Sequence, residues 1–411
     1  MKQRNILISG LSLVLMTSVS SVAMAQCTAT GTAAGFAPQY APFAVGGALN
    51  TLVSSINAAN TAFLTQSTAF VGSPANPKPD QEGGGIWARG IGGEINTKNT
   101  VSSTYALGGN GSTFQPVATP LTGGVNCNTT TNLQFAGTQV GTDMARLNWN
   151  GWNVHMGSMA GYLGARARDT TAATPGINAG GSLSNSLEVP FVGAYAAATY
   201  GSFFIDGQIR WDFYQNTIND PIQNGLFNQK IDARGLAFTA NAGYNFQLGN
   251  NWFIEPSAGI VISQVKVDPL RATGTLLLTG AGSIPNTTTF SNIESYLARL
   301  SVRVGTTIVS DKMIWQPFVT ASVYHDFAGA AKAAYSESNN PAFEALSFPL
   351  IQGNLTANNL GTYGQFALGI AGQVAGTGWL GYLRADYRTG DRIEGYSLNG
   401  GLRYQFTPDM L

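Results

Sequence analysis

The chain has 411 residues, and its 21 lysine and arginine residues balance 21 aspartate and glutamate residues, so the formal net charge is zero. That neutrality gives no electrostatic basis for binding nucleic acid, and charged residues, at 10% of the chain, are too few for the mixed-charge surface of a soluble domain. A hydrophobic share of 44% excludes disorder, yet after residue 26 no apolar run reaches the ~20 residues of a membrane-spanning helix. Together these limits predict a transmembrane β-barrel.

The N-terminus has the pattern of a signal peptide. Lys2 and Arg4 precede an apolar run at 6–16, and an Ala-Met-Ala cleavage site ends at Ala25. The apolar run is too short to span a membrane and is followed by small residues. We therefore expect 1–25 to be removed after export from the cytoplasm.

A charge-free segment at 46–72 differs from everything after it. Its apolar residues, among them Leu52 and Ile56, recur at the spacing of one helix face, and a proline-containing linker follows at 73–83. A helix of ~20 residues is about as long as the hydrocarbon region of a membrane is thick. We expect a pore helix inside the barrel, preceded by a short exposed segment at 26–45. A pre-sequence that stays outside the pore remains the alternative.

From residue 84 onward, apolar and polar side chains alternate with the period of a strand. In 202–216, for example, Phe203, Ile205 and Trp211 share one face and polar residues occupy the other. In a membrane barrel the apolar face meets lipid and the polar face meets the lumen. The pattern predicts an all-β, antiparallel transmembrane barrel of about twelve strands over 84–406, followed by a tail at 407–411. The expected strands lie at 84–97, 131–148, 150–165, 187–200, 202–217, 232–248, 251–267, 292–309, 313–327, 360–375, 378–389 and 393–406.

The lengths of the connections support this topology. Bacterial barrels have short periplasmic turns and longer external loops, and here turns of a few residues alternate with long links at 98–130, 166–186, 218–231, 268–291 and 328–359. Aromatic residues also gather near the strand ends, where an interfacial girdle belongs. These residues are Trp87, Trp152, Trp252, Trp315, Trp379, Tyr200 and Tyr404.

Many of the few charged residues alternate along the strands with the apolar, lipid-facing residues, so we expect their side chains to face the lumen. Intramembrane charges usually pair with one another, so we favour a lattice of ion pairs that fills the pore over a lining that selects a solute. The residues expected to line the pore are Glu188, Asp206, Arg210, Asp212, Glu255, Arg299, Arg303, Arg384, Asp386, Arg388 and Arg403.

The two cysteines, Cys27 and Cys127, would both enter an oxidising compartment after export. An even number of strands places the start of the first strand and the C-terminus on the periplasmic side. A helix threaded through the pore would then bring Cys27 to the outer side, where the 98–130 loop holds Cys127. A Cys27–Cys127 disulfide is therefore topologically possible, and the sequence alone leaves it open.

No catalytic, cofactor or metal site is predicted. The two histidines are His155 and His325, and His325 and Asp326 are adjacent strand residues that point to opposite faces. The chain has no G-x-S-x-G or H-E-x-x-H motif, and its glycine-rich stretches lack the strand–helix context of a phosphate loop. We expect a protein that is not an enzyme.

Several stretches resemble the translocator domain of autotransporters. The sequence GGIWARG at 84–90 is similar to the first strand of that domain, and WQPFV at 315–319, with YHDF at 324–327, is similar to a middle strand. The run at 363–406 resembles the last three strands closely. The resemblance implies a barrel of about twelve strands in a Gram-negative outer membrane, with an N-terminal helix in its pore.

The family usually ends on an aromatic residue that the outer-membrane assembly machinery reads. Leu402, Tyr404 and Phe406 would form that signal here, although 407–411 follow. Family members typically carry a large passenger, whereas only 26–45 precede the helix here, so a vestigial passenger is expected. The expected partners are outer-membrane lipid and the assembly machinery, with no nucleic acid and a monomeric barrel.

The resulting hypothesis is an autotransporter-type translocator barrel with a helix-plugged pore. Two alternatives stay open. The protein could be a porin-like open channel, or a surface adhesion protein that acts through its long loops at 98–130 and 328–359.

Overall fold

The computed structural model describes most of the chain from residue 77 onward and short pieces before it. The described ranges are 27–31, 49–50, 52–57, 60–61, 77–107, 121–170, 183–220, 226–275, 283–310, 312–337 and 351–406. The expected signal peptide at 1–25 and the tail at 407–411 lie outside them. Among the described residues, no helix is both long enough and apolar enough to cross a membrane.

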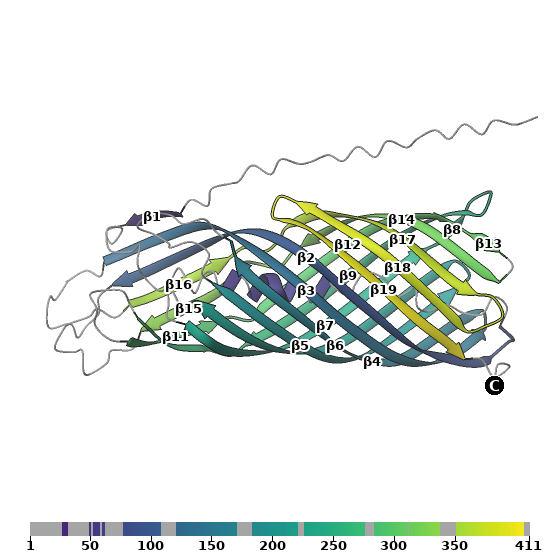
Figure 1. Cartoon of the computed structure of the whole chain (residues 1–411), viewed down its shortest axis with the longest axis horizontal. Helices are drawn as coiled ribbons and strands as arrows, with labels where there is room; N and C mark the ends of the chain where they lie inside the picture. The colour runs from purple at the N-terminus through teal and green to yellow at the C-terminus, as the bar shows by residue number, and fades with distance from the viewer. Residues whose placement is uncertain are drawn as a thin grey trace, which may run out of the picture.

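The dominant feature is a closed ring of twelve antiparallel strands, which confirms the predicted fold class. The strands are strongly tilted and enclose a short purple helix (Figure 1). The short strands β8 (Phe246–Gln247) and β13 (Ile308–Ser310) pair with β9 and β14 of the ring. The ring consists of β2 (Gln81–Leu107), β3 (Leu121–Trp149), β4 (Trp152–Asp169), β5 (Ser184–Tyr200), β6 (Phe203–Asp220), β7 (Leu226–Tyr244), β9 (Trp252–Val267), β12 (Ile293–Thr306), β14 (Met313–Asp326), β17 (Thr362–Val374), β18 (Trp379–Gly390) and β19 (Ile393–Phe406).

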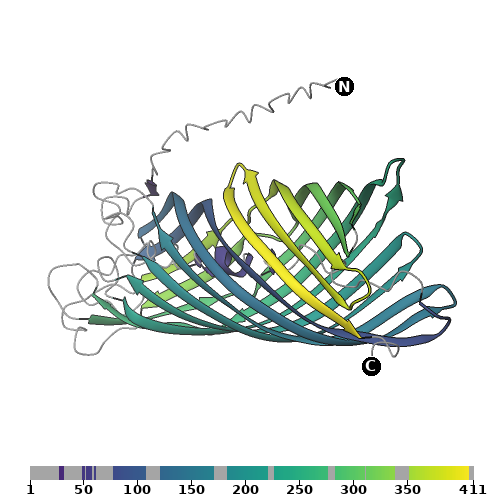
Figure 2. The same ribbon diagram turned by 45° about the vertical axis from the view of Figure 1, so that its right-hand side comes forward.

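The ring closes where the last strand meets the first. β19 pairs with β2 from Phe406 opposite Gly84 to Ile393 opposite Thr97. Figure 2 shows β19, in yellow, lying beside the dark blue β2, and β19 ends at the short-turn end of the barrel. Closure satisfies the backbone groups of both strands, which lipid would otherwise leave without partners.

Several segments expected to be loops form strands instead. These strands are β1 (Cys27–Gly31), β10 (Leu270–Thr275), β11 (Ser283–Phe290), β15 (Ala331–Glu337) and β16 (Ile351–Ala357). β2 and β3 also extend far past their predicted ends and pair with each other as far as Leu107 and Leu121. β19 pairs with β2 only as far as Thr97, so the edge of β2 beyond Thr97 is open to another strand. β16 pairs with that edge between Val101 and Leu107. The long links therefore continue the sheet beyond the ring.

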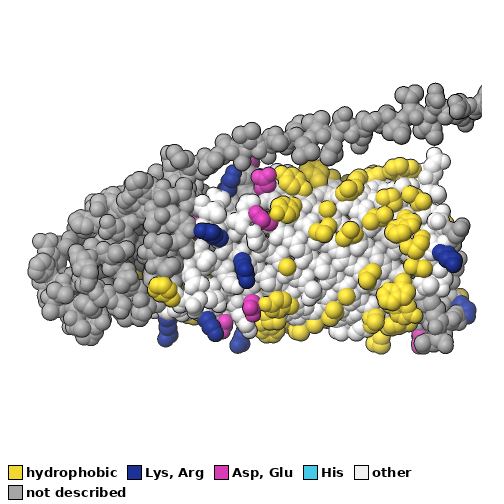
Figure 3. All heavy atoms as spheres, viewed as in Figure 1, with side chains coloured by type: hydrophobic (Ala, Val, Ile, Leu, Met, Phe, Trp, Pro, Cys, Tyr) yellow, Lys and Arg dark blue, Asp and Glu magenta, His cyan; other side chains and the backbone are white. Residues whose placement is uncertain are grey.

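The two faces of the ring differ as the alternation predicts. Large apolar side chains such as Leu300, Leu368 and Phe366 are exposed on the outer face. Figure 3 shows hydrophobic side chains, in yellow, gathered in a band across the visible face of the barrel. Aromatic residues near the short turns pack in pairs, with ring centroids 5.1 Å apart for Trp152 and Tyr200. The inner face is buried and carries the polar side chains that make up the candidate site.

Candidate functional site

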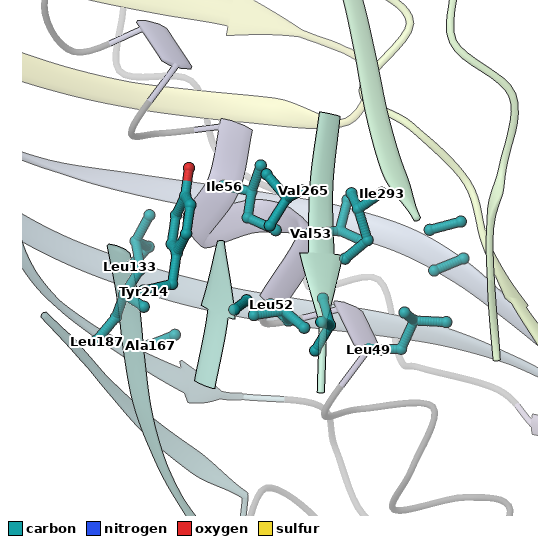
Figure 4. Close-up of a cluster of buried hydrophobic side chains, with 14 of the residues drawn as sticks. Leu49, Leu52, Val53, Ile56, Leu133, Ala167, Leu187, Tyr214, Val265 and Ile293 are labelled. Atoms are coloured by element: carbon teal, nitrogen blue, oxygen red, sulfur yellow. The ribbon is translucent and has the colours of Figure 1, made fainter. Parts of the chain in front are cut away.

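The part of the lumen nearer the long connections contains the helical residues 49–50, 52–57 and 60–61. Their apolar side chains, Leu49, Leu52, Val53 and Ile56, are at most 5% exposed. They share one buried cluster with inward-facing residues of the ring, which Figure 4 shows on both sides of the helix. The labelled ring residues are Leu133, Ala167, Leu187, Tyr214, Val265 and Ile293.

The polar side of the helix is bonded to the barrel wall. Asn50 Nδ2 donates to Thr129 Oγ1 at 2.8 Å, and Asn60 Nδ2 donates to Ser263 Oγ at 2.7 Å. The hydroxyls of Ser54 and Thr97 lie 3.0 Å apart, and Arg388 Nη1 donates to Thr61 Oγ1 at 3.0 Å. These partners come from β3, β9, β2 and β18, so the helix is bonded on several sides.

The described residues before and after the helix lie at opposite ends of the barrel. β1 pairs with β3 in a register that sets Cys27 opposite Cys127, within the outer extension of the sheet. After the helix, the backbone amide of Asp80 donates to the carbonyl of Asn148 at 3.2 Å, at the short turn between β3 and β4.

The half of the lumen nearer the short turns contains a buried network centred on Asp143. Arg403 binds the Asp143 carboxylate through two nitrogens at 2.6 and 2.8 Å. His155 Nδ1 lies 2.9 Å from Oδ1, and the Tyr195 hydroxyl donates to Oδ2 at 2.7 Å. Trp87 Nε1 donates in turn to the Tyr195 hydroxyl at 2.7 Å. Both carboxylate oxygens are occupied, so Asp143 is suited to holding its neighbours in place.

The network crosses the strand pair that closes the barrel. Arg403 lies on β19 and Asp143 on β3, with β2 between them. The side chain of Arg403 passes over Gly85 of β2, where an added Cβ would lie 2.9 Å from the guanidinium carbon. A glycine at this position therefore makes the contact across β2 possible.

Aromatic side chains in the lumen lie over glycines of the neighbouring strand. A Cβ on Gly141 would lie 2.4 Å from the Trp87 ring, and one on Gly161 would lie 2.3 Å from the Phe191 ring. Both pairs are direct cross-strand partners. Arginines pack on such rings, with the Arg210 guanidinium 5.1 Å from the centre of Phe191. Trp87 is thus part of the lumen and not of the interfacial girdle in which it was expected.

Most of the charged residues expected in the lumen are buried or half-buried and bonded to one another. Ion pairs of 2.6 Å join Arg210 to Asp212, Arg303 to Glu255 and Arg384 to Asp386. Other expected lumen residues contact amide side chains: Arg299 and Asp206 contact Asn241 at 3.0 and 2.9 Å, and Arg388 contacts Gln365 at 3.0 Å.

The expectation of an inward Glu188 is wrong. Glu188 is exposed, whereas Leu187 and Val189 on either side of it are buried. At this level the inner face packs on the helix and is apolar, so the usual rule of polar side chains inside reverses. The assignment of side chains to the inner or outer face from their polarity alone therefore fails where the helix fills the lumen.

Four other residues of the lumen, Arg89, Asp143, His155 and Tyr195, were not predicted from the sequence. Gln139, Gly141 and Asp143 alternate with exposed Val140 and Met144, so the signal was a period of two in the least regular strand. His325 and Asp326 point to opposite faces of their strand, as expected. His325 Nδ1 contacts Thr362 Oγ1 at 2.6 Å, whereas the Asp326 carboxylate accepts hydrogen bonds from the backbone amides of Tyr296 and Ala328.

The closed ring, with its apolar outer face and polar lumen, defines a transmembrane β-barrel. The family model for the autotransporter beta-domain matches residues 122–386, and the chain belongs to that family. It is an outer-membrane protein of the Gram-negative type.

Similarity to individual proteins is modest. The chain is 28% identical over 176 residues to the uncharacterized protein YuaQ of Escherichia coli strain K12, a match that covers 40% of this chain and 12% of YuaQ. It is 24% identical over 291 residues to the pertactin autotransporter of Bordetella parapertussis, which covers 70% of this chain and 26% of pertactin. The chain therefore spans about a quarter or less of the length of these relatives.

Among solved structures, the transport unit of the autotransporter AIDA-I from Escherichia coli is similar with a TM-score of 0.61. The alignment has 16% sequence identity and covers 90% of this chain and 100% of that chain. At this identity the likeness establishes the fold alone.

We predict that Arg403→Gln destabilises the barrel strongly. The substitution leaves the buried Asp143 carboxylate without its bidentate partner, and removal of one member of a buried pair costs about 3–5 kcal/mol. The free energy of unfolding, measured by urea titration of the barrel in lipid vesicles, tests this.

Arg146→Gln is the matched control. Arg146 also binds an aspartate through two nitrogens, both at 2.6 Å, but its side chain is 46% exposed at the barrel rim. Water screens that pair, so little change is expected. Equal effects of the two substitutions would contradict the structural role of the buried network.

Proposed function

We propose that this protein is a translocator-type barrel whose lumen is closed by the N-terminal helix, with only the short segment around β1 carried to the outer surface as a vestigial passenger. The observation that carries the proposal is that two described segments, one before and one after the helix, lie at opposite ends of the barrel. Pairing of Cys27–Gly31 with β3 fixes one point at the outer end, and the Asp80–Asn148 contact fixes another at the short turns. The buried helix lies between these points in sequence.

The dimensions of a barrel of this size agree with the proposal. Barrels of ~8 strands are filled by their own side chains, whereas those of ~16 leave a water-filled channel. A ring of twelve strands falls between these cases. A helix with its side chains is about 10–12 Å across, so it can fill the space that an intermediate barrel leaves.

The bonding of the helix favours a closed lumen over an open channel. Asn50, Ser54 and Asn60 are at most 3% exposed, and each is hydrogen-bonded to the wall. Withdrawal of the helix would require these contacts and the apolar cluster to break together. The ion pairs in the other half of the lumen support a structural lattice over a solute-selective lining, because each carboxylate is already engaged. The proposal assigns no catalytic role to any residue.

We also propose a Cys27–Cys127 disulfide that fastens β1 to the outer extension. Support comes from the pairing register, in which the two residues are Cα partners. Cys127 is 4% exposed, and Cys27 is the other of the two cysteines in the chain. The bridge would hold the N-terminal segment outside once the chain has passed through the pore.

Leu402, Tyr404 and Phe406 are proposed as the signal for the outer-membrane assembly machinery. They alternate with buried Arg403 and Gln405, so all three lie on the lipid-facing side of β19. β19 is also the strand that closes the ring. A signal on this strand would couple recognition of the chain end to closure of the barrel.

The plugged lumen is tested by single-channel recording in planar bilayers. We expect the full chain to show little conductance, and deletion of 46–72 to produce large, stable steps. Replacement of 46–72 by a glycine–serine segment of equal length is the control for chain length, and it should conduct like the deletion because it lacks the helix contacts. Heat-modifiable migration on gels verifies that each barrel is folded. Large conductance in the intact protein would favour the porin-like alternative.

The disulfide is tested by peptide mass mapping without reduction. A linked peptide containing Cys27 and Cys127 is expected in protein extracted from the outer membrane, and it should disappear in Cys27→Ser. Detection of both thiols in alkylated form, in protein with the helix in place, would rule the bridge out.

Phe406→Ala tests the assembly signal. The fraction of heat-modifiable barrel in the outer membrane should fall severalfold, because the terminal aromatic ring is lost. Leu398→Ala is the control, since Leu398 lies on the same face of β19 and is 54% exposed but is distant from the chain end. Normal insertion of Phe406→Ala, or an equal loss in the control, would disprove the signal.

A further inference from the structure

Exposed cations form a belt on the outer face, just beyond the apolar band and on the side of the long connections. On the visible face in Figure 3, blue and magenta side chains gather between the yellow band and the grey segments. Within the described part of the chain, none of these cations forms an ion pair. The exposed members are Lys98, Arg166, Arg168, Lys230, Arg234, Lys266 and Lys332.

Two of these cations face each other directly. Arg234 of β7 and Lys266 of β9 are Cα partners in the antiparallel ladder, and both side chains are exposed. Like charges directly opposite one another in a sheet destabilise the pair. The arrangement therefore carries an unfavourable interaction that an anion bound between the two side chains would relieve.

The surroundings of the pair are apolar on one side and acidic on the other. Toward the membrane lie Leu236 and Ile262, which are 46% and 44% exposed. Phe213 of β6 is the other Cα partner of Arg234. Away from the membrane, Asp232 and Asp268 follow on the same strands, and the backbone amide of Asp268 donates to the Asp232 carbonyl at 2.9 Å.

We propose that Arg234 and Lys266 bind a phosphate group of an outer-leaflet lipid headgroup. The guanidinium fork and the ammonium group together suit phosphate oxygens. Cations at the edge of the apolar band meet headgroups at the depth where acyl chains begin. Leu236, Ile262 and Phe213 then contact the acyl chains, which a free phosphate ion cannot do.

The acidic residues limit where the anion can lie. Asp232 and Asp268 repel a phosphate displaced outward, so they confine it to the level of the two cations. On the neighbouring strand, Glu294 accepts hydrogen bonds from Tyr296 at 3.1 Å and from Gln264 at 3.3 Å. The carboxylate is thereby oriented toward Tyr296 and Gln264, and among the described residues it forms no ion pair with Lys266.

The test is native mass spectrometry of the full-length barrel in mild detergent, titrated with diphosphoryl lipid A. Arg234→Gln/Lys266→Gln should weaken binding about 30-fold, which corresponds to about 2 kcal/mol for two cations at the membrane surface. Lys312→Gln is the matched control, because Lys312 is an exposed cation at a short turn on the other side of the band. It should bind the lipid like the unaltered protein.

Two further binding measurements identify the ligand. The dephosphorylated lipid should bind the unaltered protein as weakly as diphosphoryl lipid A binds the double variant. Millimolar inorganic phosphate should not displace the lipid. Displacement would assign the site to a free anion, and binding by the double variant within threefold of the unaltered protein would overturn the proposal.

The single variants keep the test decisive if the double variant fails to fold. Arg234→Gln and Lys266→Gln should each weaken binding about fivefold, whereas the charge-preserving Arg234→Lys/Lys266→Arg should bind within threefold of the unaltered protein. Unchanged binding in both single variants would refute the site. The helix need not close the lumen for any of these outcomes.

Discussion

Backbone hydrogen bonding in lipid is the constraint on which this structure depends. A sheet in the hydrocarbon region cannot leave an edge without partners, so the last strand of the ring must find the first. The pairing of β19 with β2 meets this requirement, and the buried contact between Arg403 and Asp143 crosses the same seam. Gly85 makes the crossing possible because its missing Cβ leaves room for the guanidinium. Closure is thus secured by the backbone ladder and by a side-chain contact beneath it.

The membrane-spanning part of the fold was predictable because lipid enforces alternation. Every other residue must be apolar on the outer face, and that rule locates twelve strands and the fold class. The alternation of apolar and polar residues is not required outside the bilayer. β15 and β16, and the outer parts of β2 and β3, are not predicted from the sequence, because outside the bilayer their exposed faces carry polar side chains such as Lys332 and lack the lipid-facing apolar pattern. These segments form strands because they pair with the exposed edge of a neighbouring strand. The local sequence pattern does not reveal that pairing.

The candidate site was less predictable, since parity assigns a side chain to a face but does not name its partner. Arg210 and Asp212 lie two residues apart on one strand, so their ion pair follows from the alternation itself. Asp143 and Arg403 are 260 residues apart, and only the closing register brings them together. Glu188 and Trp87 were misplaced because each breaks the rule of polar inside and apolar outside. Glu188 lies where the helix makes the inner face apolar, and Trp87 lies where glycine makes room for a ring.

The charge balance of the chain acquires a physical meaning from this arrangement. The net charge of zero is the sum of two groups of charged residues that lie in different surroundings. Inside the barrel, where an unpaired charge would be costly, several cations and carboxylates form ion pairs, as Arg384 and Asp386 do at 2.6 Å. On the outer face, Arg234 and Lys266 stand side by side without such a partner in the described part of the chain. Water and headgroups can solvate them there, so the barrel concentrates its unpaired charge where the membrane itself can supply the counter-ion.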